Sequence, residues 1–447
     1  MNNTSIRIGA GAGYAGDRIP PALELAQYGQ LDWLVFECLA ERTIALAQLE
    51  RRQQSDKGFD PLLLDRMRAV LPTCLAKGTR ILSNMGAANP LQAGHEVLRV
   101  ARELGLQGVK VAVVQGDDVL ERLLTDGLEL SLIDSGAPLA NLQDRLISAN
   151  AYLGADALLP ALQTDVQVIL CGRVADPAMF LAPLMHHFGW AANDWPTLGQ
   201  GILIGHLLEC AGQITGGYFA DPGFKDVPNL ARLGFPLAEV QVDGSAVITK
   251  VAGSGGCVTV VTCTEQLLYE IENPARYLQP DVVADFSQVH LTPDGPDRVR
   301  ATGASGQPRP ETLKVTVGYH DGYIGEGQMG YAGPGCVARG QLALELVRQR
   351  LQDAGLGQLE ARYELIGINS LLPQAQTSSE PNEVRLRVAV RTPTRQQAQL
   401  VANEVEALYT NGPAAGGGAT KSVREVVAAA AVLVPRDWAQ PQVTVLG

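Results

Sequence analysis

Short, almost uninterrupted apolar runs, separated by amphipathic stretches, fill the first half of this 447-residue sequence. The runs predict strands at residues 6–11, 32–37, 80–84, 109–116 and 166–172. Between two of them, Ala93–Leu104 carries apolar residues at helical spacing. Strands that are apolar on both faces and alternate with helices are typical of a parallel sheet. We therefore expect an α/β fold whose mainly parallel sheet has helices on both faces.

The second half changes character near residue 236. Clusters of β-branched residues and an Asp243-Gly244 turn predict strands, which lie at 239–251, 257–265 and 311–323. A helix, two strands and a second helix are then expected at 338–351, 363–368, 384–391 and 395–409. This order predicts an α+β domain at 236–447 that packs over the strand ends of the parallel α/β domain at 1–235. The glycine-rich segment Tyr409–Ala419 would then form a wall or lid of the site.

Charge and composition exclude several classes of partner. The formal net charge is −12, which disfavours binding to nucleic acid. No apolar run is long enough to predict a membrane span, and the N-terminus lacks the pattern of a signal peptide. The seven cysteines form no CxxC pair, which fits a reducing compartment. We expect a cytoplasmic, homo-oligomeric protein that binds a small molecule.

Polar residues follow every predicted parallel strand. In strand order they are Asp17 and Arg18, Glu37, Asn84 and Asn89, Asp117 and Asp118, and then Cys171, Arg173 and Asp176. Ligands bind at the carboxyl ends of such strands, although each polar residue could instead only cap the next helix. The hypothesis is that Asp117 or Asp118 acts as the base and Glu37 as its partner. Arg173 and Arg18 would hold a substrate carboxylate.

The first strand runs into a glycine-rich turn that contains Gly11, Gly13 and Gly16. Its position after a strand, with Glu37 about 20 residues further on, agrees with a dinucleotide-binding turn. Asp17 would repel a pyrophosphate, however, and Pro20-Pro21 places the helix start beyond the glycines. We favour a turn that holds a substrate carboxylate or phosphate together with Arg18. A nucleotide site and a structural turn that needs positive φ remain alternatives.

Two further choices concern the fifth strand and metals. Cys171 could be a nucleophile, but a packed thiol beneath a substrate-binding Arg173 is favoured. The adjacent carboxylates of Asp117 and Asp118 are compatible with Mg²⁺, yet no third ligand stands at convincing spacing. No metal ligand is therefore predicted, the cofactor stays unknown, and a divalent ion is left open.

Several segments together resemble the acyclic terpene utilisation family AtuA. They are "GAGYAGDR" (11–18), "ECLAERTIA" (37–45), "NMGAANP" (84–90), "NAYLGA" (150–155), "GRVADPA" (172–178), "GHLLECAGQITGGYFADPG" (205–223), "EQLLYEI" (265–271) and "YTNGPAAGGGA" (409–419). The resemblance implies a role in degrading citronellol and geraniol through branched acyl-CoA intermediates, including cleavage of a hydroxy-acyl-glutaryl-CoA. Some relatives carry an added ferredoxin-fold domain, so the resemblance also implies a small partner protein of that fold.

We expect an enzyme of carboxylate or acyl-CoA catabolism. The favoured activity is a lyase that cleaves a carbon–carbon bond, or adds or removes water, on a branched hydroxy-acyl or di- or tricarboxylate substrate. The alternatives are a nucleotide-dependent enzyme that uses the glycine turn and a non-catalytic subunit of a two-protein complex.

Overall fold

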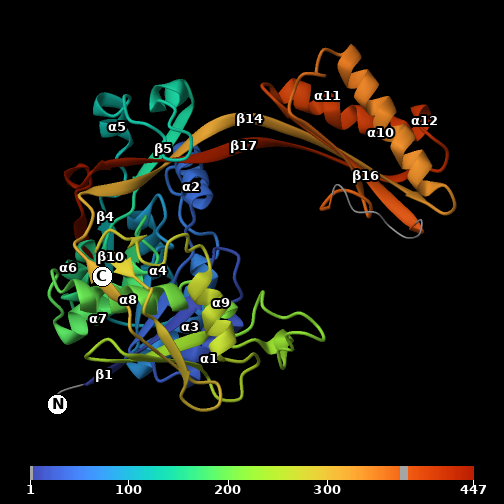
Figure 1. Cartoon of the computed structure of the whole chain (residues 1–447). Helices are drawn as coiled ribbons and strands as arrows, with labels where there is room; N and C mark the ends of the chain where they lie inside the picture. The colour runs from blue at the N-terminus through green and yellow to red at the C-terminus, as the bar shows by residue number, and fades with distance from the viewer. Residues whose placement is uncertain (1–3, 373–380) are drawn as a thin grey trace. The chain divides into compact units, whose positions relative to one another are not determined.

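The computed structural model describes residues 4–372 and 381–447. Two compact units make up the chain: unit 1 is Met1–Gly318 with Ala429–Gly447, and unit 2 is Tyr319–Ala428. The chain leaves unit 1 along one long strand, β14 (Thr312–Ala332), and returns along another, β17 (Gly417–Pro435). Unit 2 is thus inserted within the sequence of unit 1 (Figure 1).

One large mixed sheet forms the centre of unit 1. Its strands are β1 (Ser5–Ala12), β2 (Trp33–Phe36), β3 (Arg80–Ser83), β4 (Val111–Gln115), β6 (Val168–Cys171), β7 (Pro236–Gln241), β8 (Ala246–Lys250), β11 (His290–Pro293), β12 (Val299–Thr302) and β18 (Gln442–Leu446). They lie in the order β11-β12-β8-β7-β1-β2-β3-β6-β4-β18. The central run β1-β2-β3-β6-β4 is parallel, which confirms the expected parallel sheet.

Two groups of helices pack on this sheet. The helices of unit 1 are α1 (Pro20–Tyr28), α2 (Glu41–Gln53), α3 (Leu63–Lys77), α4 (Pro90–Glu103), α5 (Leu120–Asp126), α6 (Leu159–Leu162), α7 (Ala178–Phe188), α8 (Trp195–Leu208) and α9 (Val260–Leu268). α1, α3 and α4 pack on one another and on β1 and β4, whereas α6, α7 and α8 form the other group. α7 and α8 are buried along most of their length, as expected for helices that are apolar on nearly every face.

Smaller elements complete unit 1. Strand β5 (Leu146–Ala151) pairs with β14, and β9 (Tyr277–Leu278), β10 (Val283–Asp285) and β13 (Ser305–Gln307) form a separate three-stranded sheet. Short 3-10 helices lie at Leu139–Arg145, Ala155–Ala157, Ala211–Gln213, Leu230–Arg232 and Arg436–Trp438. The described residues include no helix with the length and apolar character needed to cross a bilayer.

Unit 2 is an α+β unit with its own core. Its remaining elements are β15 (Ala361–Ile366), β16 (Glu383–Thr392), α10 (Cys336–Asp353), α11 (Arg395–Glu406) and α12 (Leu408–Asn411). The strand order is β15-β16-β14-β17, and α10 and α11 pack side by side on β16 (Figure 1). These bounds confirm the helices and strands expected at 338–351, 363–368, 384–391 and 395–409.

The structure of the second half differs from two of the expectations. The expected boundary at 235/236 falls inside unit 1, because β7 begins at Pro236 and pairs with β1 in the main sheet. The strand expected at 257–265 is wrong, since Val260–Leu268 is helix α9. There, Thr259 and Thr262 form a capping box, and this local hydrogen bonding prevails over the strand preference of β-branched residues. Packing of 236–447 over the strand ends, with Tyr409–Ala419 as a lid, stays a prediction.

Candidate functional site

The carboxyl ends of β2 and β3 are joined by a buried hydrogen-bond pair, Glu37 and Asn84. Glu37 Oε1 accepts the Leu39 backbone N–H at 2.8 Å and the Asn84 amide at 3.0 Å, and Asn84 Oδ1 accepts the Cys38 N–H at 2.8 Å. Burial raises the pKa of Glu37 to about 8, and Asp176 adds to the rise, although Arg173 opposes it. Glu37 is therefore positioned to carry a proton at neutral pH.

Arg173, just beyond β6, is 1% exposed. Its guanidinium donates to the Leu39 carbonyl, to the Val174 carbonyl at 2.7 and 3.0 Å, and to the Asp176 carboxylate. One face of it lies 4.3 Å from the centre of the Tyr152 ring. Because these protein groups occupy all its nitrogens, Arg173 holds the loops after β2 and β6 together and supplies positive charge to the acids around it.

Tyr152, Glu41 and Lys314 form a partly exposed group beside Arg173. Tyr152 donates its hydroxyl to Glu41 Oε1 at 2.5 Å, and Lys314 Nζ donates to the same oxygen at 3.2 Å. Burial opposes ionisation of Glu41, but these two partners and Arg173 together lower its pKa to about 2. Lys314 also lies 4.9 Å from the Tyr152 ring, and about half of its side chain is exposed. Lys314 is thus a cation that solvent can reach.

A second group of acids comes from the end of α8. His206 Nδ1 lies 2.9 Å from Glu209 Oε1, and both side chains are buried. The pKa of Glu209 is raised to about 7, first by burial and also by the charges of Asp176 and Glu270, although His206 opposes the rise. Burial raises the pKa of the adjacent Cys210 thiol, and the charge of Glu37 is among the smaller contributions to this rise. A Cβ at Gly205 of α8 would lie 2.6 Å from the Pro177 carbonyl oxygen, so the end of α8 lies beside the loop that carries Asp176.

Sequence reasoning left this second group out of the predicted site. Its signal is the composition of α8, in which His206 is the only ionisable residue of an otherwise apolar or neutral helix. Ionisable groups are seldom fully buried unless they are paired, so such a residue indicates a partner such as Glu209. Glu270 is exposed and has φ of +59°, a backbone conformation that is rare outside glycine and concentrated at functional sites.

Asp117 and Asp118, expected to supply the base, are occupied by other contacts. Asp117 Oδ2 accepts the Arg173 N–H at 3.0 Å and the Asn150 amide at 2.8 Å. Burial raises its pKa to about 6. Asp118 is exposed, and its carboxylate accepts the Leu120 N–H at the start of α5 and the Gln48 amide, both at 3.2 Å. Asp117 thus supports the loop of Arg173, and Asp118 accepts the first N–H of α5.

Cys171 is packed rather than exposed. Its Sγ donates to the Ser83 carbonyl at 3.4 Å, and burial raises the pKa of the thiol, with Asp117 adding to the rise. A thiol of this kind is a poor nucleophile, because the thiolate is the reactive form. This agrees with the favoured interpretation of a packed cysteine beneath Arg173.

The glycine turn closes on itself. The Gly13 N–H donates to Asp17 Oδ2 at 3.0 Å, so the carboxylate of Asp17 takes a donor that an anion nest would offer. A side chain at Gly13 would meet the backbone of Cys210 at 2.4 Å, while Gly11 lies against the Phe36 ring and Gly16 against Tyr14. No positive φ is found at these glycines. Close packing therefore explains Gly11 and Gly13.

The structure also shows where α1 begins and which groups Arg18 and Asn89 contact. Helix α1 begins at Pro20, as expected from the sequence, and so starts beyond the glycines. Arg18 donates to the Ala231 carbonyl at 3.1 Å, and Asn89 donates to the carbonyls of Ser55 and Lys57. The contacts of Arg18 and Asn89 thus lie apart from the group around Glu37.

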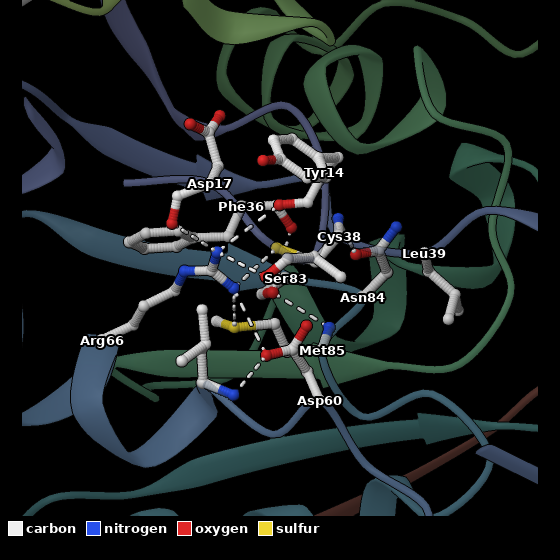
Figure 2. A network of polar contacts seen from close by, with 12 residues as sticks. Tyr14, Asp17, Phe36, Cys38, Leu39, Asp60, Arg66, Ser83, Asn84 and Met85 are labelled. Carbon is white, nitrogen blue, oxygen red and sulfur yellow. Dashed lines mark hydrogen bonds and ion pairs between the residues drawn. The ribbon is translucent and has the colours of Figure 1, made fainter. Parts of the chain in front are cut away.

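A buried arginine of α3 holds the turn from below. Figure 2 shows Arg66 directed at the glycine turn, where it donates to the carbonyls of Tyr14, Ala15 and Asp17 at 3.4, 2.9 and 3.2 Å. It also contacts Cys38 Sγ at 3.2 Å and pairs with Asp60 at 3.3 Å. Arg66 therefore links the turn after β1 to the loop after β2, a role with no local signal in the sequence.

Contacts join Glu37 and Asn84, Arg173 and Asp176, and Tyr152 and Glu41, and Cys171 packs beneath the end of β3. Arg173 lies on the Tyr152 ring and binds the loop of Glu37, and the charges of Asp176 and Glu270 act on Glu209. About a third of the Asp176 side chain is exposed, at 35%, so the group reaches solvent there. Over residues 4–372 and 381–447, no three His, Cys, Asp or Glu side chains are placed to hold a metal ion. The arrangement suits proton transfer, because the pKa values of Glu37 and Glu209 are raised whereas that of Glu41, which is paired with Lys314, is lowered.

Comparisons with known proteins give one extended match. The sequence model of the family described as "Acyclic terpene utilisation family protein AtuA" matches residues 6–445. No curated protein matches the sequence. The chain is similar to the crystal structure of a homoserine dehydrogenase from Thiobacillus denitrificans, at 11% identity over 91% of this chain and 83% of that chain, with a TM-score of 0.14. A likeness of that size carries no argument about fold or activity.

Proposed function

Because the chain belongs to the acyclic terpene utilisation family AtuA, we propose that it is an enzyme of that process which works by acid–base catalysis. The favoured reaction is that of a lyase, either a carbon–carbon cleavage or the addition or removal of water. Its substrate would be a branched hydroxy-acyl thioester or a di- or tricarboxylate. Both reactions require one group that removes a proton and another that donates one.

The observation that carries this proposal is the grouping of Glu37 and Asp176 around Arg173, with Glu209 under the influence of the Asp176 charge. Glu37, with a pKa of about 8, holds a proton at pH 7 and would act as the acid. Asp176 is paired with Arg173 and 35% exposed, so it would act as the base; burial raises its pKa, and Arg173 opposes that rise. Lys314 would attract the substrate anion, a role that the sequence had suggested for Arg173 and Arg18.

The nucleotide alternative finds less support. A pyrophosphate would have to displace the Asp17 carboxylate from the Gly13 N–H, and it would then lie beside that negative charge. The helix that would direct its N-terminus at the phosphate begins only at Pro20.

The test begins with a thermal-shift screen against acyl-CoAs, di- and tricarboxylates, nucleotides and divalent ions, followed by product analysis with each ligand that binds. Replacing Glu37 by Gln should lower kcat by about 10²- to 10⁴-fold and leave binding of that ligand nearly unchanged. The matched control is Glu50→Gln, at an exposed position of α2, which should keep full activity. Unchanged kcat in Glu37→Gln rejects the acid assignment, and binding without turnover of any ligand favours a non-catalytic subunit.

A further inference from the structure

An apolar pocket of about 300 Å³ opens between the 3-10 helix at Ala211–Gln213, the loop that follows it, and α9. Phe219, Leu268 and Tyr269 provide much of its apolar lining. Its volume lies at the lower end of the range of about 300–1,000 Å³ found for small-molecule sites. Leu268 is 61% exposed, so the pocket is an apolar surface open to solvent.

The loop that forms one wall is held in an unfavourable conformation. Tyr218 lines the pocket, has φ of +60° and is 94% exposed, so packing of its own ring does not explain its backbone. Phe224, further along the same loop, is also strongly exposed. Bulky residues rarely adopt positive φ, and such strain is concentrated at ligand-binding segments.

The polar side chains of the pocket carry almost no net charge. The carboxylate of Glu265 is paired with Lys225, whose ammonium also lies 4.8 Å from the Phe219 ring. The other polar side chains include the amides of Gln213 and Gln266. Gln213 Oε1 is buried without a hydrogen-bond partner, a costly state that a donor on a ligand would relieve. This lining favours an uncharged chain that carries a hydroxyl or N–H group.

Contacts connect the floor of the pocket to the acid group. Gln266 donates to the His206 carbonyl at 3.0 Å, and His206 in turn contacts Glu209 at 2.9 Å. Tyr269 is adjacent in sequence to Glu270, whose charge acts on both Tyr269 and Glu209. The pocket is thus connected to Glu209 through Gln266 and His206.

We propose that this pocket binds the apolar chain of a ligand whose hydrogen-bond donor meets Gln213. It would be the chain-binding part of the site at Glu37, Asp176 and Glu209. Binding of the apolar chain is argued from the pocket alone. Only the position of the ligand's reacting end at these acids rests on the proposed function.

The test uses the full chain with 1-butanol, 1-hexanol and 1-octanol, which carry a hydroxyl donor but no acidic group. Affinity should rise by about four-fold for each added methylene until the pocket is filled. Leu268→Asp places a charge in the lining and should weaken binding of 1-octanol by at least about ten-fold. Val261→Asp is the matched control on the same helix, since Val261 is 56% exposed and does not line the pocket. It should bind 1-octanol like the wild type.

Leu268→Trp provides a second variant, because a bulky ring at this exposed position should fill the pocket without introducing charge. A melting curve of each variant shows whether it is folded. Leu268→Trp should therefore also weaken binding of 1-octanol. No binding of 1-octanol by the wild type, affinity that is independent of chain length, or wild-type affinity in both Leu268 variants would overturn the proposal. Glu37→Gln should bind 1-octanol normally, so loss of the proposed activity and loss of the pocket can be told apart.

Discussion

Glu37 links the chemistry of a single carboxyl group to the stability of unit 1. Its pKa is raised to about 8 in the folded protein, from an ordinary value of 4.5. The folded state therefore binds more protons than the unfolded state between these values, so the free energy of unfolding should fall as pH rises from about 4.5 to 8. The change should be on the order of a few kcal/mol.

Urea unfolding of the wild type and of Glu37→Gln at pH 5, 7 and 9 measures this effect. The glutamine variant should lose less stability with increasing pH and should be the more stable of the two at pH 9. Parallel pH profiles in the two proteins would mean that Glu37 ionises normally in the folded state.

At this scale the sequence predicted part of the site. The rule that ligands bind at the carboxyl ends of parallel strands selected Glu37, Asn84, Arg173 and Asp176, which the structure brings together. It also selected Asp118, which accepts the Leu120 N–H at the start of α5 and the Gln48 amide instead. The rule could not select Arg66, because the groups it contacts lie about 50 residues away in the sequence, where no local pattern records them.

Among the elements, the glycine turn shows how packing determines residue choice. Alanine at Gly13 would place Cβ 2.4 Å from the Cys210 backbone, which has no flexible side chain to move aside. Alanine at Gly16 would meet only the Tyr14 ring, which is largely exposed. We expect Gly13→Ala to lower the free energy of unfolding by roughly 1–3 kcal/mol and Gly16→Ala by clearly less.

Chemical denaturation of the two alanine variants compares them directly. The sequence had favoured a turn that holds a substrate carboxylate or phosphate. A stable Gly13→Ala protein with impaired ligand binding would restore that view, and with it a direct role for the turn in binding.

Periodicity predicted the elements with a clear apolar pattern and missed those without one. The parallel strands were found because they are almost uninterrupted apolar runs, and α10 because its apolar residues recur at helical spacing. Helix α9 was missed because Val260 and Val261 suggest a strand, whereas the capping box of Thr259 and Thr262 fixes a helix start. Strand β17 was missed because its glycine and alanine residues have little preference for strands, and pairing in the sheet determines their conformation.

For the whole molecule, the insertion of unit 2 gives a clear prediction. The chain crosses between the units along β14 and β17, which are neighbours in one sheet. Replacing 319–428 by a short glycine–serine linker should leave unit 1 folded, with binding of 1-octanol intact, since the pocket lies wholly in unit 1. Circular dichroism and calorimetry measure this. A shortened protein that fails to fold would show that unit 1 depends on unit 2 for stability.

Strand β18 has a consequence for the order of synthesis. It pairs with β4 and so covers the outer side of that strand, which would otherwise present free N–H and C=O groups. Yet residues 442–446 are translated after all of unit 2. Until the ribosome has released them, β4 has an open edge of the kind that promotes association between nascent chains. Unit 2 can complete its fold earlier, so cellular chaperones would bind a nascent chain in which unit 2 is folded and unit 1 is still incomplete.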